Sequence, residues 1–226
     1  MYSDYVNQSI YGIDFIFTKY GLNDFLTVNG YPLLTVIWNI ALLAVPFYAV
    51  KSLEKYYRET GLKKIKNKIL AGVMIFIWLI FMPNAAYIIS DARHISNFCF
   101  NNSLYRVCPE NAWVIIIFFF YAAIGLAAYI FLLNQMRKFI AALWNGKKAA
   151  IFIFSAIPLI SLGLLLGLLN RWNSWEIFIN PIKILKSAEI YFLNPAYFKD
   201  WLIFTAFLLA LYAGGNFAIK KIYKLL

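Results

Sequence analysis

The sequence contains few charged residues. Asp, Glu, Lys and Arg make up 14% of its 226 residues and hydrophobic residues make up 63%, whereas soluble domains hold about 25% charged and about 45–50% apolar residues. This composition excludes an ordinary soluble globule. The chain also lacks visible internal repeats, low-complexity stretches and linkers, so we expect residues 1–226 to form a single membrane domain.

Charge is absent from five long apolar runs. Runs of about 20 such residues cross a hydrocarbon core of about 30 Å as helices. Barrel strands would alternate polar and apolar residues, and these runs do not, so helices are the remaining structure. The sequence therefore predicts an all-α, polytopic transmembrane helix bundle of about five spans, with short interfacial helices. The spans are Leu33–Val50, Ile69–Ile89, Ala112–Leu133, Ala149–Leu169 and Trp201–Ile219.

The segments outside these runs alternate in charge. One set has a net charge of −1 and the other a net charge of +12. The first set is Ser3–Pro32, Asp91–Asn111 and Asn170–Asp200, and the second is Lys51–Lys68, Asn134–Lys148 and Lys220–Leu226. Basic residues in short loops stay in the cytoplasm. We therefore predict a bacterial cytoplasmic (inner) membrane protein with its N-terminus outside and its C-terminus in the cytoplasm.

The formal charge of +11 by itself suggests nucleic-acid binding. Topology and attraction to anionic lipid account for this charge, however, and leave no basic patch unexplained. We therefore expect membrane lipids, and no nucleic acid, as partners.

Two segments outside the spans are candidates for short helices. Met1–Asp24 lacks the basic start of a cleavable signal peptide, and its Ile10–Phe17 stretch is too short to span, which favours an interfacial or re-entrant helix. In the other segment, Lys183, Lys186 and Glu189 recur every three residues, as in a helix on the membrane surface. A packed loop is the alternative for this second segment.

Cysteine is scarce. Cys99 and Cys108 both lie in the second predicted outer loop, where an oxidising compartment permits a disulfide. Two free thiols are the alternative, and only His94 is close enough in sequence to serve as a base for a catalytic cysteine.

The end of the second span carries a polar stripe. Asn84, Tyr87, Asp91 and His94 are spaced three, four and three residues apart, so their side chains share one face of a helix. Lipid would leave these groups unsatisfied, so the stripe requires a protein or water-filled neighbour. Pro83 removes a helical hydrogen bond where the stripe begins, and we expect a bend there.

The end of the fourth span carries a second polar group, Arg171 to Glu176. Arg171 and Trp175 are four residues apart, which predicts one helical face and a cation–π contact or an anion site. The predicted topology puts both span ends on the outer side, where Arg171 and Asp91 are the expected ion pair. The alternative is purely structural, with interhelical ion pairs and tryptophans at the membrane boundary.

These residues resemble a known family. The pattern Pro-Asn-Ala-x-Tyr-Ile-x-x-Asp-x-x-His at 83–94, the Arg-Trp-Asn-Ser-Trp-Glu at 171–176, and the earlier Trp38-Asn39 and Pro46 are similar to a bacterial integral membrane family catalogued as a domain of unknown function, number 1361. The resemblance implies a multi-span membrane protein and no particular activity.

The polar residues favour a membrane enzyme acting on a lipid or lipid-linked envelope substrate. In this hypothesis His94 is the general base, Asp91 orients it and Glu176 is the acid. The predicted substrate-binding residues are Asn84, Tyr87, Arg171, Asn173, Ser174 and Trp175. No cofactor is indicated, and a metal held by the three catalytic candidates is a weak variant because their spacing is not a known ligand pattern.

Two other classes of function stay open. A transporter or transport subunit would use Asn39, Asn84 and Asn216 as polar groups within the spans. A non-catalytic partner in an envelope complex would use the aromatic outer surface for binding.

Overall fold

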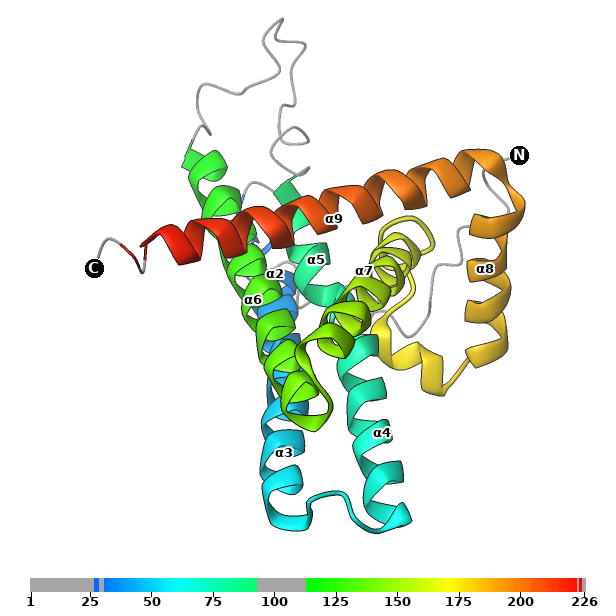
Figure 1. Cartoon of the computed structure of the whole chain (residues 1–226). Coiled ribbons are helices and arrows are strands. Elements are labelled where there is room, and N and C mark those ends of the chain that lie inside the picture. The colour runs from blue at the N-terminus through cyan, green and yellow to red at the C-terminus, as the bar shows by residue number, and fades with distance from the viewer. Residues whose placement is uncertain (1–26, 29–30, 93–112, 223, 225–226) are drawn as a thin grey trace, which may run out of the picture.

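The chain forms a bundle of long helices (Figure 1). The computed structural model describes residues 27–28, 31–92, 113–222 and 224. In chain order the described helices are α2 (Leu33–Leu42), α3 (Ala44–Thr60), α4 (Ile65–Phe81), α5 (Pro83–Ser90), α6 (Trp113–Leu143), α7 (Gly146–Leu169), the 3-10 helix η5 (Ser174–Phe178), α8 (Pro181–Leu193) and α9 (Pro195–Ile222). The predicted all-α class is confirmed.

Five helical segments are long and apolar enough to cross a membrane. They are Leu33–Thr60, Ile65–Ser90, Ile115–Leu143, Gly146–Leu169 and Pro195–Ile222, and each contains the core of one predicted span. The protein is therefore a multi-pass membrane protein whose exposed apolar helices contact lipid. A two-residue antiparallel pair, β1 (Thr27–Val28) with β2 (Tyr31–Pro32), precedes α2 and was not predicted.

The helix of the second span is interrupted for one residue at Met82, just before Pro83, where a bend was predicted. α4 ends at Phe81, and the amide of Met82 donates to the carbonyl of Trp78 at 2.9 Å. Pro83 then takes the first position of α5 and, because it has no N–H, removes the hydrogen bond that a continuing helix would make to the carbonyl of Leu79. The polar stripe is thus carried by a short helix that is separate from α4.

α5 packs closely between α6 and α7 because two glycines face it. A Cβ atom on Gly125 of α6 would lie 2.6 Å from Ile88 Cγ2, and one on Gly163 of α7 would lie 2.5 Å from Pro83 Cγ. Both distances are far below ordinary contact, so a side chain at either position would push α5 away. The two glycines therefore fix the depth at which α5 lies in the bundle.

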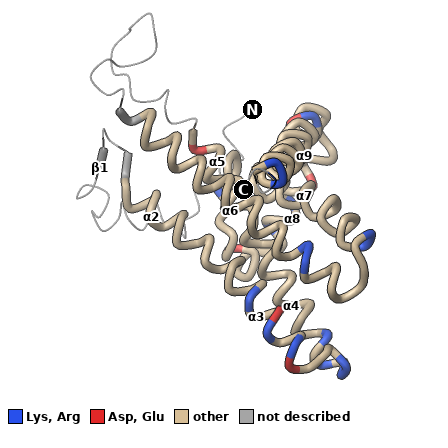
Figure 2. Tube along the Cα trace, turned by 60° about the vertical axis from the view of Figure 1, so that its left-hand side comes forward, with Lys and Arg blue, Asp and Glu red and all other residues tan. Residues whose placement is uncertain are grey.

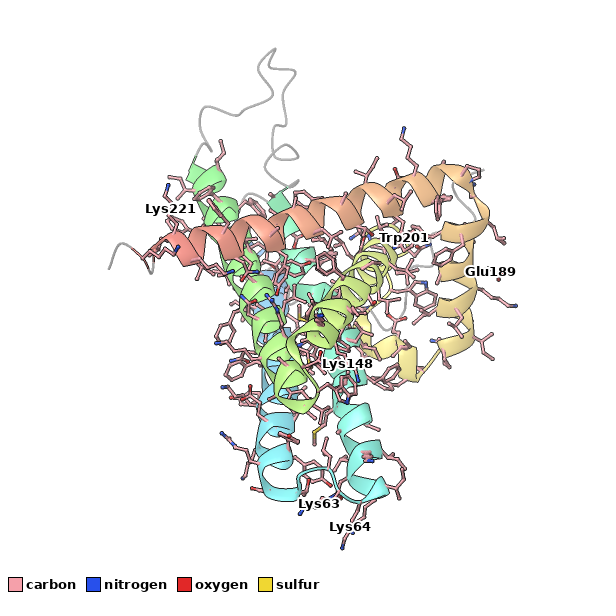
Figure 3. All side chains as sticks on the ribbon, viewed as in Figure 1. Lys63, Lys64, Lys148, Glu189, Trp201 and Lys221 are labelled. Carbon is pink, nitrogen blue, oxygen red and sulfur yellow. The ribbon has the colours of Figure 1, made fainter. Side chains whose placement is uncertain are left out.

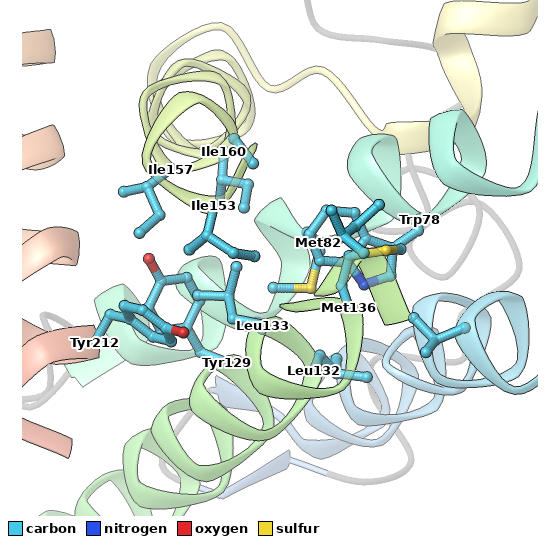
Figure 4. Close-up of a cluster of buried hydrophobic side chains, with 14 of the residues drawn as sticks. Trp78, Met82, Tyr129, Leu132, Leu133, Met136, Ile153, Ile157, Ile160 and Tyr212 are labelled. Atoms are coloured by element: carbon cyan, nitrogen blue, oxygen red, sulfur yellow. The ribbon is translucent and has the colours of Figure 1, made fainter. Parts of the chain in front are cut away.

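The main core lies where α4, α6 and α7 meet (Figure 4). Trp78 and Met82 pack there with Leu133 and Met136 of α6 and Ile157 of α7, and all five side chains are fully buried. Outside this core, the surface of the long helices is rich in exposed Leu, Ile and Phe, as expected for helices in contact with lipid.

α9 crosses the bundle instead of running alongside it. In Figure 1 it lies across α6, and in Figure 2, after a turn of 60°, it is strongly foreshortened while α6 keeps its length. Only 11% of the most apolar stretch of α9 is buried within the protein. Hydrogen bonds tie it down: Trp201 Nε1 donates to the Pro158 carbonyl at 2.9 Å, and Asn134 Nδ2 donates to Asn216 Oδ1 at 2.7 Å.

This crossing affects the charge pattern. In Figure 3, Lys221 near the end of α9 lies apart from Lys63 and Lys64, which cap the opposite end of the bundle in the α3–α4 turn. The sequence groups all three residues on the cytoplasmic side. Because Lys221 lies away from the other two, the predicted orientation of the bundle depends on the basic residues in and around the α3–α4 and α6–α7 turns. This orientation stays a prediction.

The segment before α9 is helical, as its charge spacing predicted. Lys183, Lys186 and Glu189 lie on the exposed face of α8, while Ile184 and Tyr191 are buried against the bundle. The packed-loop alternative is therefore wrong, and a position of α8 at the membrane surface stays a prediction. The predicted helix near Ile10–Phe17 and the cysteines of the second outer loop lie outside the described residues.

Candidate functional site

α5 places three of the predicted stripe residues. Asn84 and Tyr87 lie on α5 and are half-buried, and Asp91 follows its last residue and is fully buried. Asn84 and Asp91 are seven residues apart, which is about 10 Å along a helix. His94 lies outside the described residues, so its predicted role as base stays a prediction.

The chain turns sharply after α7. The carbonyl of Leu166 accepts hydrogen bonds from the amides of Asn170, at 3.2 Å, and Trp172, at 3.1 Å. This double contact is possible because Arg171 adopts a left-handed backbone, with φ of 60°. A non-glycine residue in that region costs about 1–2 kcal/mol, and strain of this kind is often found at functional sites.

The turn leads into η5, whose start holds a buried carboxylate. Glu176 is fully buried, and its Oε1 accepts from the backbone amide of Asn173 at 3.2 Å and from Asn173 Nδ2 at 2.6 Å. Two donors on one oxygen hold the carboxylate in a fixed direction. Asn173, predicted to bind substrate, is therefore seen to position Glu176.

The two polar motifs of the sequence meet directly. Asn84 Nδ2 donates to the Phe81 carbonyl at 3.0 Å and to Ser174 Oγ at 3.1 Å, across 90 positions of the sequence. Tyr87 lies nearby against α7, where a Cβ on Gly167 would be 3.7 Å from its ring. The structure thus brings Asn84, Tyr87 and Ser174 into one region, as the predicted topology required.

The first span joins this region through an aromatic contact. Trp175 and Trp38 meet edge to face, with ring centroids 6.1 Å apart and planes at 85°. Such pairs contribute about 0.5–1.5 kcal/mol beyond the area that they bury. Trp38 was part of the family pattern in the sequence, but nothing in its local sequence indicated Trp175 as its partner.

Two expected contacts of Arg171 do not form. Within the described residues the ion pairs are Lys51–Glu54 and Lys55–Glu59, and Arg171 is exposed and pairs with neither Asp91 nor Trp175. The expectation assumed that α7 continues through residue 175, which would put Arg171 and Trp175 on one face. Because α7 ends at Leu169 and the backbone turns left-handed, helical spacing does not apply there.

An apolar groove of about 210 Å³ lies beside these polar residues. It is bounded by α4, α7, η5 and α8, and by Pro83 and Trp172. Trp172 is held in place by its Nε1, which donates to Ser187 Oγ of α8 at 3.1 Å. No sequence pattern indicated this groove, because its walls are ordinary apolar residues that lie far apart in the chain. They include Leu79, Ile80, Leu162, Leu166, Ile177 and Ile184.

The described residues contain no group of three Asp, Glu, His or Cys side chains close enough to hold a metal ion. The metal variant of the site requires His94, which lies outside them.

Comparisons with known proteins give one match. The search of curated proteins and the search of solved structures each found no similar chain. The model of one protein family matches residues 38–212, which include Trp38, the stripe on α5 and the polar turn after α7. The chain therefore belongs to the family described as protein of unknown function, DUF1361.

Proposed function

We propose that this chain is a membrane enzyme that acts on a lipid or lipid-linked substrate where α5 and η5 meet. The observation that carries the proposal is the pair of fully buried carboxylates, Asp91 and Glu176. Each belongs to one of the two polar motifs that the hydrogen bond from Asn84 to Ser174 joins: Asp91 lies seven residues after Asn84, and Glu176 lies two residues after Ser174. Ionisable groups buried in a membrane protein are costly, so their presence favours a functional role.

The two carboxylates have different neighbours, which suits two different roles. Asn173 fixes one oxygen of Glu176 by two hydrogen bonds, and we assign Glu176 as the acid. Asp91 stands three residues before His94 in the sequence, and we assign Asp91 as the group that orients the imidazole of His94, the base.

The remaining polar residues form a rim for a polar head group. Ser174 offers a hydroxyl group, and the exposed Arg171 offers a cation for an anionic substrate. The charge asymmetry of the loops favours the outer leaflet of a bacterial inner membrane as the place of action.

A transporter is less favoured because two of its three candidate polar residues, Asn84 and Asn216, are hydrogen-bonded within the protein. Asn216 is hydrogen-bonded to Asn134 and to the Tyr212 carbonyl, and Asn84 is bonded to Phe81 and Ser174. These side chains serve helix packing.

The test compares isosteric substitutions. The purified protein is reconstituted with the total lipid extract of its source membrane, and lipid composition is followed by mass spectrometry. We expect wild-type protein to convert one lipid class, and Glu176→Gln and Asp91→Asn to abolish conversion. Glu189→Gln, on the exposed face of α8, is the matched control and retains it.

Each outcome has a definite meaning. All variants are first compared by gel filtration and thermal unfolding, so that loss of fold is recognised. Full conversion by Glu176→Gln, or no conversion by folded wild-type protein in the complete extract, contradicts the proposal.

A further inference from the structure

We propose that the groove between α4, α7, η5 and α8 binds one ester-linked acyl chain of a membrane lipid, with the ester carbonyl at Ser174. Acyl-chain binding is argued from the groove itself. Only the statement that the bound lipid is the substrate depends on the proposed function.

The walls of the groove select hydrocarbon. Among its described lining residues the side chains are aliphatic or aromatic, except for the neighbours Asn173 and Ser174. Asn173 is engaged with Glu176, and Trp172 turns its N–H to Ser187. Polar contact with a ligand is therefore confined to one place in the groove, and the rest suits a chain without hydrogen-bonding groups.

The size of the groove fits part of a single chain. Its volume of about 210 Å³ is moderately larger than the ~150 Å³ of an apolar cavity that holds benzene. This volume holds a stretch of one chain, and the apolar lining disfavours a polar head group. The remainder of the lipid stays in the bilayer, which the exposed rim residues Phe76 and Leu159 already contact.

Contacts within the protein hold the walls of the groove in place. Pro83 is packed against Gly163 on one side, and the Trp172–Ser187 hydrogen bond fixes the turn before η5 to α8 on the other. Rigid walls reduce the entropy lost on binding. The occupant is an acyl chain because acyl chains form the hydrocarbon that surrounds α4 and α7.

Among the described residues, no hydrogen bond uses the hydroxyl hydrogen of Ser174. Its Oγ accepts from Asn84 Nδ2 at 3.1 Å, and a hydroxyl group carries one hydrogen besides its acceptor sites. That hydrogen is available for the carbonyl of an ester at the polar end of the groove. An ether-linked lipid has no such carbonyl and loses this contact.

The experiment uses the full-length protein in vesicles that contain a phospholipid with a diazirine in its ester-linked acyl chain. After illumination, mass spectrometry maps the cross-linked residues. We expect saturable labelling of the groove at Leu162 and Ile177, and non-saturable labelling of exposed α9 residues such as Phe207. An excess of unlabelled ester lipid competes for the groove.

Two tryptophan substitutions on α7 form a matched pair. Leu159 is 51% exposed at the groove rim, and Leu169 is 42% exposed outside the groove. Leu159→Trp should abolish groove labelling while labelling of α9 persists, and Leu169→Trp should leave both unchanged. Equal labelling of groove and α9, without saturation and without an effect of Leu159→Trp, overturns the proposal.

The ester contact is tested separately. Ser174→Ala should weaken groove binding of the ester lipid by about two- to tenfold, the value of one hydrogen bond, and should leave binding of the ether analogue unchanged. An equal loss for both lipids overturns the role of Ser174. Competition by a polyisoprenoid lipid but not by the ester lipid overturns the acyl assignment.

Failure of the two proposals is distinguishable. Glu176→Gln should keep groove labelling while it stops conversion. If wild-type protein shows groove labelling but converts no lipid, the acyl-chain site stands and the proposed enzyme activity is contradicted. If Leu159→Trp protein still converts lipid, the groove does not take part in the reaction.

Discussion

Replacement of Gly163 by alanine should push α5 away from α7. The new methyl group would lie 2.5 Å from Cγ and 3.1 Å from Cβ of Pro83. The pyrrolidine ring cannot rotate out of the way, and Pro83 is buried at the first turn of α5. The strain must therefore move the backbone of α5, and with it Asn84.

The magnitude follows from two opposing terms. Overpacking a tight contact costs about 1–3 kcal/mol. Alanine returns up to about 1 kcal/mol through its higher helix propensity. With the full propensity gain of about 1 kcal/mol subtracted, Gly163→Ala should lower the free energy of unfolding by about 0–2 kcal/mol, and by about 1–3 kcal/mol relative to a glycine-to-alanine change that meets no neighbour.

The assay is reversible unfolding by SDS in mixed micelles, followed by circular dichroism. Gly72→Ala is the matched control, since Gly72 is also within a long helix and a Cβ there meets nothing within 4 Å. This control should be neutral or stabilised by up to about 1 kcal/mol. Equal unfolding free energies for the two variants would refute the close approach of α5 to α7.

Three further predictions concern other contacts. In the same unfolding assay, a double-mutant cycle between Asn134→Ala and Asn216→Ala should give a coupling free energy of about 0.6 kcal/mol, and at most about 1.7 kcal/mol. Zero coupling would contradict the hydrogen bond that ties α9 to α6. Trp172→Phe should lower stability by about 0.5–1.5 kcal/mol through loss of the Ser187 contact, and a similar loss in a Ser187→Ala background would show that this contact is not the cause. With the native cysteines replaced, Lys63→Cys in the α3–α4 turn should react with an impermeant maleimide only in inverted vesicles, and reaction in intact cells would reverse the orientation.

The sequence alone determined where the long helices are. Hydrocarbon forces each apolar run to satisfy its own backbone hydrogen bonds, which is a local requirement that composition reveals. The interruption just before Pro83 is local for the same reason, because proline removes a donor wherever it stands. Asn84, Tyr87 and Asp91 could be assigned to one polar stripe because they share a continuous stretch of helix and turn.

The tertiary structure decided how these helices meet. The end of α7 at Leu169 and the left-handed Arg171 redirected Trp175 towards Trp38 and left Arg171 exposed. Helical spacing describes only residues inside one helix, so it does not apply across such a turn.

Contacts between distant segments were also decided by the tertiary structure. The hydrogen bond from Asn84 to Ser174, the apolar groove and the crossing of α9 join residues that lie far apart in the chain. These features depend on which faces pack together, and that choice depends on shape, such as the missing side chain of Gly163 under Pro83. In a membrane, where lipid is as apolar as the helices themselves, close packing and a few interhelical hydrogen bonds select the arrangement.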